Sequence, residues 1–139
     1  FTFSILSYMQ KLVILVSNNN LDTLYHALTL ALSARALGWT VKVFITSQAV
    51  GLFIRGSKKK FSMPFFARLF LNWQMKRLKI TNADKMLAEA LKENVEFYVD
   101  EAGLKIIGAN KEDLIDGVKL SGSITFLTEA READVVISL

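Results

Sequence analysis

Residues 11–38 pass from a continuous apolar run to a helical apolar pattern, and this change of period constrains the fold more than any other feature. The run LVILV at residues 12–16 is short, rich in β-branched side chains and free of polar alternation. Such a run is typical of a strand that is covered on both faces of a parallel sheet. Apolar residues then recur at helical spacing from Leu21 to Leu32, until Gly38 supplies a helix stop. The order predicts a strand followed by a helix.

Three asparagines, Asn18, Asn19 and Asn20, separate the strand from the helix. Asparagine caps helices through its side-chain oxygen and tolerates the left-handed conformation, so these residues suit a tight turn. The start of a helix can also hold an anion, but this turn lacks the glycines of a dinucleotide fingerprint and the Lys-Ser/Thr pair of a P-loop. Two interpretations stay open, a turn with a cap and a loop that contacts a ligand.

The alternation of strand and helix patterns continues to residue 139. Further strands are predicted at residues 40–46, 95–99, 118–120 and 134–139. Further helices are predicted at residues 47–56, 64–79, 81–94, 111–115 and 121–133. This alternation predicts an α/β fold with one doubly wound, parallel, five-stranded sheet and helices on both faces. We expect residues 1–8 to be an N-terminal extension and residues 9–139 to form a single domain with a variable segment at residues 55–80.

Composition limits the chemistry that this chain can perform. The sequence contains no cysteine, which excludes disulfides, thiolate metal sites and cysteine nucleophiles. His26 is the only histidine, so a two-histidine metal motif is excluded, and we interpret it as a hydrogen-bonded or solvent-facing side chain. No run of about 18 uncharged apolar residues exists, so no transmembrane helix is predicted. We expect neither a metal nor a cofactor.

Polar residues follow several of the predicted strands. In parallel α/β sheets, ligands bind beyond the carboxyl ends of the strands, where the winding reverses. We therefore predict a site for a small polar or weakly anionic ligand at this edge, formed by Asn18, Asn19, Asn20, Ser47, Gln48, Asp100, Ser121 and Gly122. Asp100 and Glu101 are adjacent carboxylates that could serve acid-base chemistry if one were desolvated, and a solvated turn is the alternative.

The formal net charge of +4 has its basic excess in the middle of the chain. Three lysines occupy residues 58–60, and the helix predicted at residues 64–79 carries aromatic side chains on one face. Burial of that face between copies of the chain would form a homo-oligomer, which we expect. A peripheral membrane contact is the alternative, and a nucleic-acid adaptor is the less favoured one.

Two stretches of the sequence resemble the DsrE/DsrF-like family, and most closely its DsrE2 branch, whose members are often labelled peroxiredoxin-family proteins. They are KLVILVSNNNLDTLYHALTLALSARALGWTVKVFIT at residues 11–46 and IIGANKEDLIDGVKLSGSITFLTEA at residues 106–130. In the family, the first stretch is a strand, a polar turn, Leu-Asp and a Leu-Tyr helix. The second is a glycine, DLIDGV and a Thr/Phe-Leu helix. The matching residues are Asp113, Leu114, Ile115, Asp116, Gly117, Val118 and Gly122.

The resemblance implies a three-layer α/β sandwich, oligomerisation and a cytoplasmic setting in sulfur metabolism. Relatives hand sulfane sulfur between proteins as a cysteine persulfide, and the branch typically carries that cysteine just after the third strand. The matching position in this chain is Asp100. A carboxylate cannot carry a persulfide, because sulfur transfer needs a thiolate as nucleophile and leaving group.

What the resemblance therefore implies is a cysteine-free DsrE-like protein that is a non-catalytic subunit or a small-ligand-binding component in sulfur or redox metabolism. Its partners would be sulfur-relay or redox proteins. The alternative is an enzyme that uses the carboxylates and amides of the cleft, with Asp100 as general base.

Overall fold

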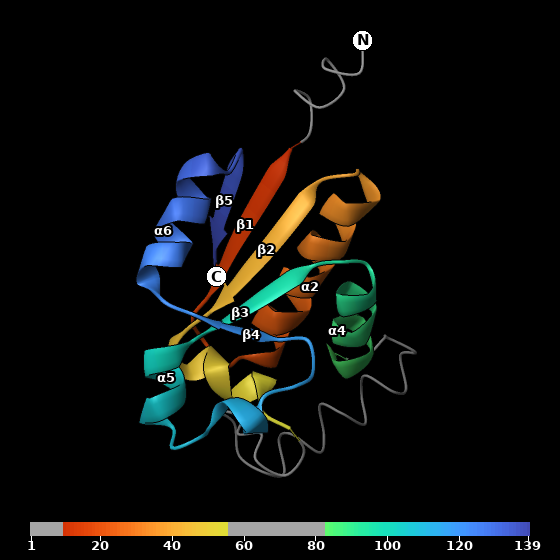
Figure 1. Ribbon diagram of the computed structural model, residues 1–139. Coiled ribbons are helices and arrows are strands. Elements are labelled where there is room, and N and C mark those ends of the chain that lie inside the picture. Colours follow the sequence, from red (N-terminus) through yellow and green to blue (C-terminus); the bar gives the residue numbers. More distant parts are fainter. Residues whose placement is uncertain (1–9, 56–82) are drawn as a thin grey trace.

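The computed structural model describes residues 10–55 and 83–139 of the chain. The strands are β1 (Lys11–Val16), β2 (Thr40–Ile45), β3 (Glu96–Asp100), β4 (Lys119–Ser121) and β5 (Val135–Ser138). The α-helices are α2 (Leu21–Ala36), α4 (Ala83–Lys92), α5 (Glu101–Ile106) and α6 (Ser123–Glu132), and two 3-10 helices are η1 (Ser47–Phe53) and η3 (Lys111–Asp113). Figure 1 shows strands and helices alternating along the chain, as the sequence predicts in outline. The helix α5 was not predicted, and the helix predicted at residues 111–115 is the 3-10 helix η3.

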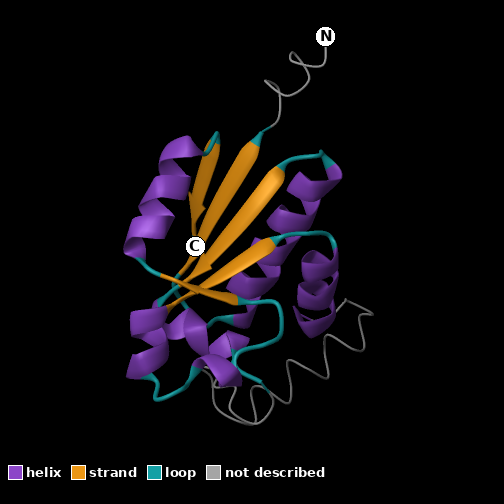
Figure 2. Cartoon of the chain, viewed as in Figure 1, coloured by secondary structure: helices purple, strands orange, loops and turns teal. Residues whose placement is uncertain are grey.

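The five strands form one parallel sheet in the order β4-β3-β2-β1-β5. The chain steps outward from β1 to β4, and then α6 returns it to the opposite side of β1, where β5 pairs. This reversal places α2 and α4 on one face of the sheet and α6 on the other (Figure 2). The predicted doubly wound fold with helices on both faces is confirmed.

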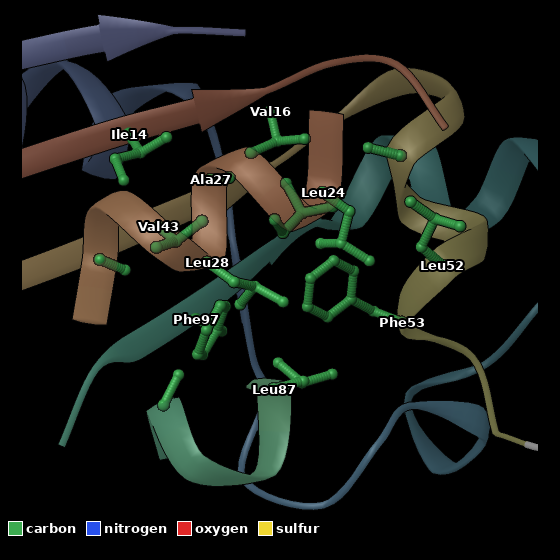
Figure 3. Packing of buried hydrophobic residues seen from close by; sticks show 14 of the residues in the cluster. Ile14, Val16, Leu24, Ala27, Leu28, Val43, Leu52, Phe53, Leu87 and Phe97 are labelled. Atoms are coloured by element: carbon green, nitrogen blue, oxygen red, sulfur yellow. The ribbon is translucent and has the colours of Figure 1, made fainter. Parts of the chain in front are cut away.

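The face beneath α2 and α4 is apolar throughout. Alternate residues of the central strands point into it, including Ile14, Val43 and Phe97, each at most 2% exposed. From α2, Leu24 and Leu28 pack onto these strand residues (Figure 3). Full burial of one such side chain stabilises the fold by roughly 1.5–3 kcal/mol, so this layer carries most of the stability of the sheet.

The carboxyl end of the same layer is closed by η1. Phe53 of η1 is fully buried and stacks at a tilt against Phe97, with ring centroids 5.8 Å apart. Figure 3 shows Phe53 between Leu24 of α2 and Leu87 of α4. The predicted short helix after β2 therefore exists, but as a 3-10 helix whose main role is to complete the core.

The helix α2 ends where the sequence predicts. Gly38 has φ of +83°, the left-handed conformation that glycine adopts without strain. The guanidinium of Arg35 donates to the backbone oxygen of Glu93 at 2.8 Å and to that of Trp39 at 2.6 Å. These bonds tie the end of α2 to the turn that follows α4.

The other face of the sheet is polar and aromatic, and α6 covers it only in part. Half-buried residues of α6 and its C-cap recur at helical spacing and form an inward stripe: Phe126, Glu129, Ala130 and Ala133. The carboxylate of Glu129 binds the ammonium groups of Lys11 and Lys42, the latter at 3.0 Å. Lys42 also lies 3.5 Å from Glu96 on β3. A chain of ion pairs thus fixes α6 across three strands.

This network shifts the ionisation of its members. Hydrogen bonds from Lys11 and Lys42 lower the pKa of Glu129, against the opposing effect of burial. Burial disfavours the charge of Lys42, but the hydrogen bond to Glu129 and the nearby negative charges outweigh it and raise the pKa of Lys42. Both groups therefore hold their charges over a wider pH range than they would in water.

Several predictions fall outside the described residues. They are the N-terminal extension at residues 1–8, the basic run at residues 58–60, the aromatic helix at residues 64–79 and the start of the helix at residues 81–94. Within residues 10–55 and 83–139, no helix has the length and apolar character needed to cross a membrane.

Candidate functional site

A pocket of about 180 Å³ opens at the carboxyl edge of the sheet, on the face that α6 covers. We term it the α6 pocket. Its lining comes from the ends of four strands and the first turn of α6: Leu15, Phe44, Ile45, Thr46, Tyr98, Asp100, Ser121, Gly122, Ser123 and Phe126. The pocket lies at the edge where parallel α/β sheets bind their ligands.

The inner wall of the α6 pocket is aromatic. The ring of Phe44 stacks on Tyr98 with centroids 5.0 Å apart, and Phe126 meets Phe44 edge to face at 5.3 Å. Such pairs hold one another in fixed orientations. Burial and the nearby charge of Glu96 raise the pKa of Tyr98, so its phenol stays neutral at pH 7. The wall thus offers ring surfaces and no charge.

The rim of the pocket is polar and centres on Asp100. This residue ends β3 and precedes α5, but its side chain does not cap that helix. Instead, its Oδ2 accepts a hydrogen bond from Oγ1 of Thr46 at 3.2 Å. Ser121 on β4 is the register partner of Asp100, so its hydroxyl lies on the neighbouring strand at the same level. A carboxylate and two hydroxyl-bearing residues therefore meet at one edge.

The helix α5, which follows Asp100, packs closely against η1. A Cβ atom at Gly103 of α5 would come within 2.9 Å of Cγ2 of Val50 in η1 and within 3.7 Å of Oδ2 of Asp100. The contact with Val50 is shorter than a real side chain tolerates, so glycine at this position lets α5 pack against η1. Ser47, the first residue of η1, adopts φ of 53°, which strains a non-glycine residue.

Of the residues predicted from the sequence to bind a ligand, Asp100, Ser121 and Gly122 line the α6 pocket together. Ser123, and not Gly122 or Ser121, is the first helical residue of α6, and Gly122 occupies the N-cap position. The cap therefore has no side chain, and the space around Gly122 is open, since no atom lies within 4 Å of a Cβ built there.

The three asparagines lie elsewhere. Asn20 caps α2, because its Oδ1 accepts the backbone N–H of Asp22 at 2.8 Å. Asn18 forms the preceding turn, with its Oδ1 accepting the N–H of Asn20 at 2.9 Å. Their turn-and-cap role is confirmed. Neither these residues nor Asn19 line the α6 pocket, because the turn leads to α2 on the opposite face. A ligand contact at the asparagines stays a prediction.

Ser47 and Gln48 also lie outside the lining of the α6 pocket. Both are exposed in the first turn of η1, directly after Thr46, which does line the pocket. His26 is exposed on α2, as one of the two structural interpretations expected. Within residues 10–55 and 83–139, no cluster of three or more histidine, aspartate or glutamate side chains is arranged to hold a metal ion.

Sequence reasoning missed the aromatic wall and Thr46. The signal was present as a period of two: Lys42 and Phe44 of β2 and Thr46 just after it lie on one face, and Val43 and Ile45 lie on the other. On β3, Glu96, Tyr98 and Asp100 repeat the same order of charged, aromatic and oxygen-bearing side chains. Because successive side chains point to opposite faces, this pattern marks one face of the sheet as polar and partly open.

A comparison with known families decides the identity of the fold. The model of the DsrE/DsrF-like family matches residues 10–139, almost the whole chain. The chain belongs to the DsrE/DsrF-like family. The match includes the residues of the α6 pocket, which is therefore part of the family domain and not an addition to it.

Solved structures share this DsrE/DsrF-like fold. The ychN protein from E. coli is 24% identical, with a TM-score of 0.70 over 94% of this chain and 100% of its own. MTH1491 from Methanobacterium thermoautotrophicum, a protein of unknown function, is 15% identical, with a TM-score of 0.58 over 92% of this chain and 98% of its own. BT1422 from Bacteroides thetaiotaomicron, a conserved protein of unknown function, is 14% identical, with a TM-score of 0.60 over 94% of this chain and 95% of its own. No curated protein matches the sequence significantly.

Proposed function

We propose that this DsrE/DsrF-like chain is a non-catalytic component of sulfur or redox metabolism that binds a small ligand in the α6 pocket. One observation carries the proposal: Asp100 lines that pocket at the carboxyl end of β3. In the DsrE2 branch, which the sequence resembles, the sulfur-carrying cysteine occupies the matching place. The family position is thus kept as a binding position, while its thiol chemistry is absent from this sequence.

The chemistry of the lining supports binding over catalysis. Among the described residues that line the pocket, Asp100 is the one acidic side chain, and none is a lysine, arginine or histidine. Its carboxylate accepts a hydrogen bond from the hydroxyl of Thr46, and no histidine or lysine among the described lining residues could act as a second acid or base. A general base alone supplies only part of an acid–base mechanism. Turnover of a substrate by Asp100 would favour the enzyme alternative.

Family likeness and the aromatic segment supply the rest of the proposal. The chain would act in the cytoplasm beside sulfur-relay or redox proteins. A homo-oligomer is proposed from the aromatic face of residues 64–79, which lies outside the described residues. Light scattering of the wild type and of Trp73→Ala tests this part, and a monomeric wild type at tens of micromolar would remove it.

A thermal-shift screen tests the binding function directly. The compounds are small amines, alcohols, carboxylates, thiols, sulfur oxyanions and nucleotides. Gly122→Leu is the blocking variant, because Gly122 lines the pocket, a Cβ there would meet no other atom, and its φ of −134° suits any residue. We expect at least one compound to stabilise the wild type and to lose its effect on Gly122→Leu. No shift from any compound, or shifts that survive the block, would contradict the function.

A further inference from the structure

The charge, wall and size of the α6 pocket indicate which ligand it accepts, an inference that rests on the proposed binding function. We propose that the α6 pocket takes a small primary amine in its ammonium form, with a short apolar body against the aromatic wall. The ammonium group would bind at Asp100, and the body would lie against the rings of Phe44 and Phe126.

Charge is the first support for an amine. Asp100 lines the pocket with its carboxylate, and no lysine or arginine belongs to the lining within residues 10–55 and 83–139. Of the neighbouring lysines, Lys42 lies 3.0 Å from Glu129, and Lys119 lies 3.7 Å from Glu96 with its ammonium group 5.7 Å from the ring centroid of Tyr98. The N-termini of α6 and of the short helix α5, which Asp100 precedes, carry only partial positive charges. The carboxylate of Asp100 is thus a full negative charge at the pocket rim, and a cation is its natural partner.

Hydrogen-bonding capacity is the second support. An ammonium group has three donors and no acceptor, so it needs several oxygen atoms around it. Asp100 has one oxygen, Oδ1, that the bond from Thr46 leaves available, and Oδ2 keeps a second lone pair. The hydroxyl of Ser121, on the adjacent strand, adds a neutral acceptor in register with Asp100. A carboxylate ligand would instead meet Asp100 as a like charge.

The wall and the volume define the rest of the ligand. Aromatic faces attract cations and also receive alkyl chains. A volume of about 180 Å³ is ample for a short alkylamine. The sequence predicts a small polar or weakly anionic ligand in a cleft shared by the asparagine turn and Asp100, whereas the α6 pocket, which contains Asp100 but not the asparagines, favours a cation.

A charge series on one alkyl body tests the proposal. Butylamine, butanol and butyrate are titrated into the full chain at pH 7 by calorimetry or NMR. We expect butylamine to bind at least roughly 10-fold more tightly than butanol, a difference of about 1.4 kcal/mol, and butyrate to bind most weakly. Tighter binding of butyrate, or no binding of butylamine, would overturn the amine assignment.

Two variants, each without one carboxylate charge, test whether Asp100 causes the preference for butylamine over butanol. Asp100→Asn keeps the shape of the side chain and removes its charge, so butylamine and butanol should then bind within about 3-fold of each other. Glu101→Gln removes the same charge from the next residue, whose side chain is 61% exposed and pairs with Lys105 at 3.8 Å. This control should keep the preference for butylamine. Loss of the preference in Glu101→Gln, or its survival in Asp100→Asn, would overturn the proposal.

The possible outcomes test the amine assignment and the proposed binding function separately. If another compound of the screen binds and Gly122→Leu blocks it, while butylamine shows no preference, the amine assignment fails and the binding function stands. If no compound of either set binds the wild type, both fail.

Discussion

The hydroxyl of Thr46 donates a hydrogen bond to Oδ2 of Asp100 over 3.2 Å and so joins the ends of β2 and β3 at the rim of the α6 pocket. Asp100 stands at the N-cap position of α5, where an aspartate side chain usually binds the helix backbone. Here it turns toward Thr46 instead. This choice of partner keeps the carboxylate on the pocket side of the sheet.

Replacing Thr46 tests whether this bond orients Asp100. Thr46→Val keeps the branched shape and removes the donor, so the carboxylate should lose its fixed position. We expect butylamine to bind a few-fold more weakly, while the free energy of unfolding falls by about 1 kcal/mol, as for an ordinary hydrogen bond. Thr46→Ser retains the hydroxyl and should bind as the wild type does. Equal affinities for the valine and serine variants would show that Thr46 does not position Asp100.

The ion pairs beneath α6 should make stability depend on pH on the acid side. The pKa of Glu129 is lowered below its ordinary value of 4.5, mainly by its hydrogen bond from Lys11. A group with a lowered pKa stabilises the fold above its ordinary pKa, and this contribution is lost as the pH falls through the lowered value. We therefore expect the wild type to lose part of its stability as the pH falls below about 4.5.

The variant Glu129→Gln should lose stability at pH 7 by roughly 1–3 kcal/mol, because it leaves Lys11 and Lys42 half-buried with fewer negative partners. The difference in free energy of unfolding between this variant and the wild type should shrink as the pH falls from 5 to 3. Glu132→Gln is the matched control, since Glu132 is 67% exposed and reaches Lys11 only at 3.7 Å. Urea unfolding at several pH values measures both, and a difference that is independent of pH would be inconsistent with this role of Glu129.

Loss of the Asn20 cap of α2 should lower the free energy of unfolding and leave ligand binding in the α6 pocket unchanged. Asn20→Ala removes the oxygen that accepts the N–H of Asp22, so we expect the free energy of unfolding to fall by about 1 kcal/mol. Asn20→Ser keeps an acceptor and should stay within a few tenths of a kcal/mol of the wild type. Binding in the α6 pocket should be unchanged in both variants. If Asn20→Ala abolished binding instead, the asparagine turn would belong to the ligand site.

Most of the fold could be predicted because its signals are local. The apolar run at residues 12–16, the helical period of α2 and the left-handed Gly38 all appear in consecutive residues. The parallel direction of the strands follows from the alternation of strands and helices, because two neighbouring parallel strands need a crossover connection, usually a helix. These features depend on neighbours along the chain.

The candidate site was predicted only in part because its geometry depends on the two faces of the sheet. Sequence position places Asn20 and Ser121 at the same carboxyl edge, but not on the same side of it. The face is decided by where the next helix packs. The helix α2, which follows Asn20, packs on one face of the sheet, and α6, which follows Ser121, packs on the other. Phe126 reaches the pocket from α6, and its contact with Phe44 joins residues that are distant in the sequence. A single sequence contains no direct signal for that contact.

Treatment with polysulfide tests the prediction that this chain carries no covalently bound sulfur. The wild type contains no cysteine, so intact mass spectrometry should show no added sulfur after treatment and desalting. Asp100→Cys is the positive control, because it places a thiol at the pocket rim, and it should gain at least one sulfur atom that a reductant removes. A stable sulfur adduct on the wild type would contradict the non-catalytic role.

The central claim is that the α6 pocket is where this chain binds its small ligand, and an NMR titration tests it most directly. Amide shifts are followed while butylamine, or the strongest compound of the screen, is added to the labelled full chain. We predict that the largest shifts fall at residues 44–46, 98–100 and 121–126, which contain most of the pocket lining, and that Gly122→Leu removes them. Largest shifts at residues 18–20 and 47–48, or shifts that persist in Gly122→Leu, would contradict the claim.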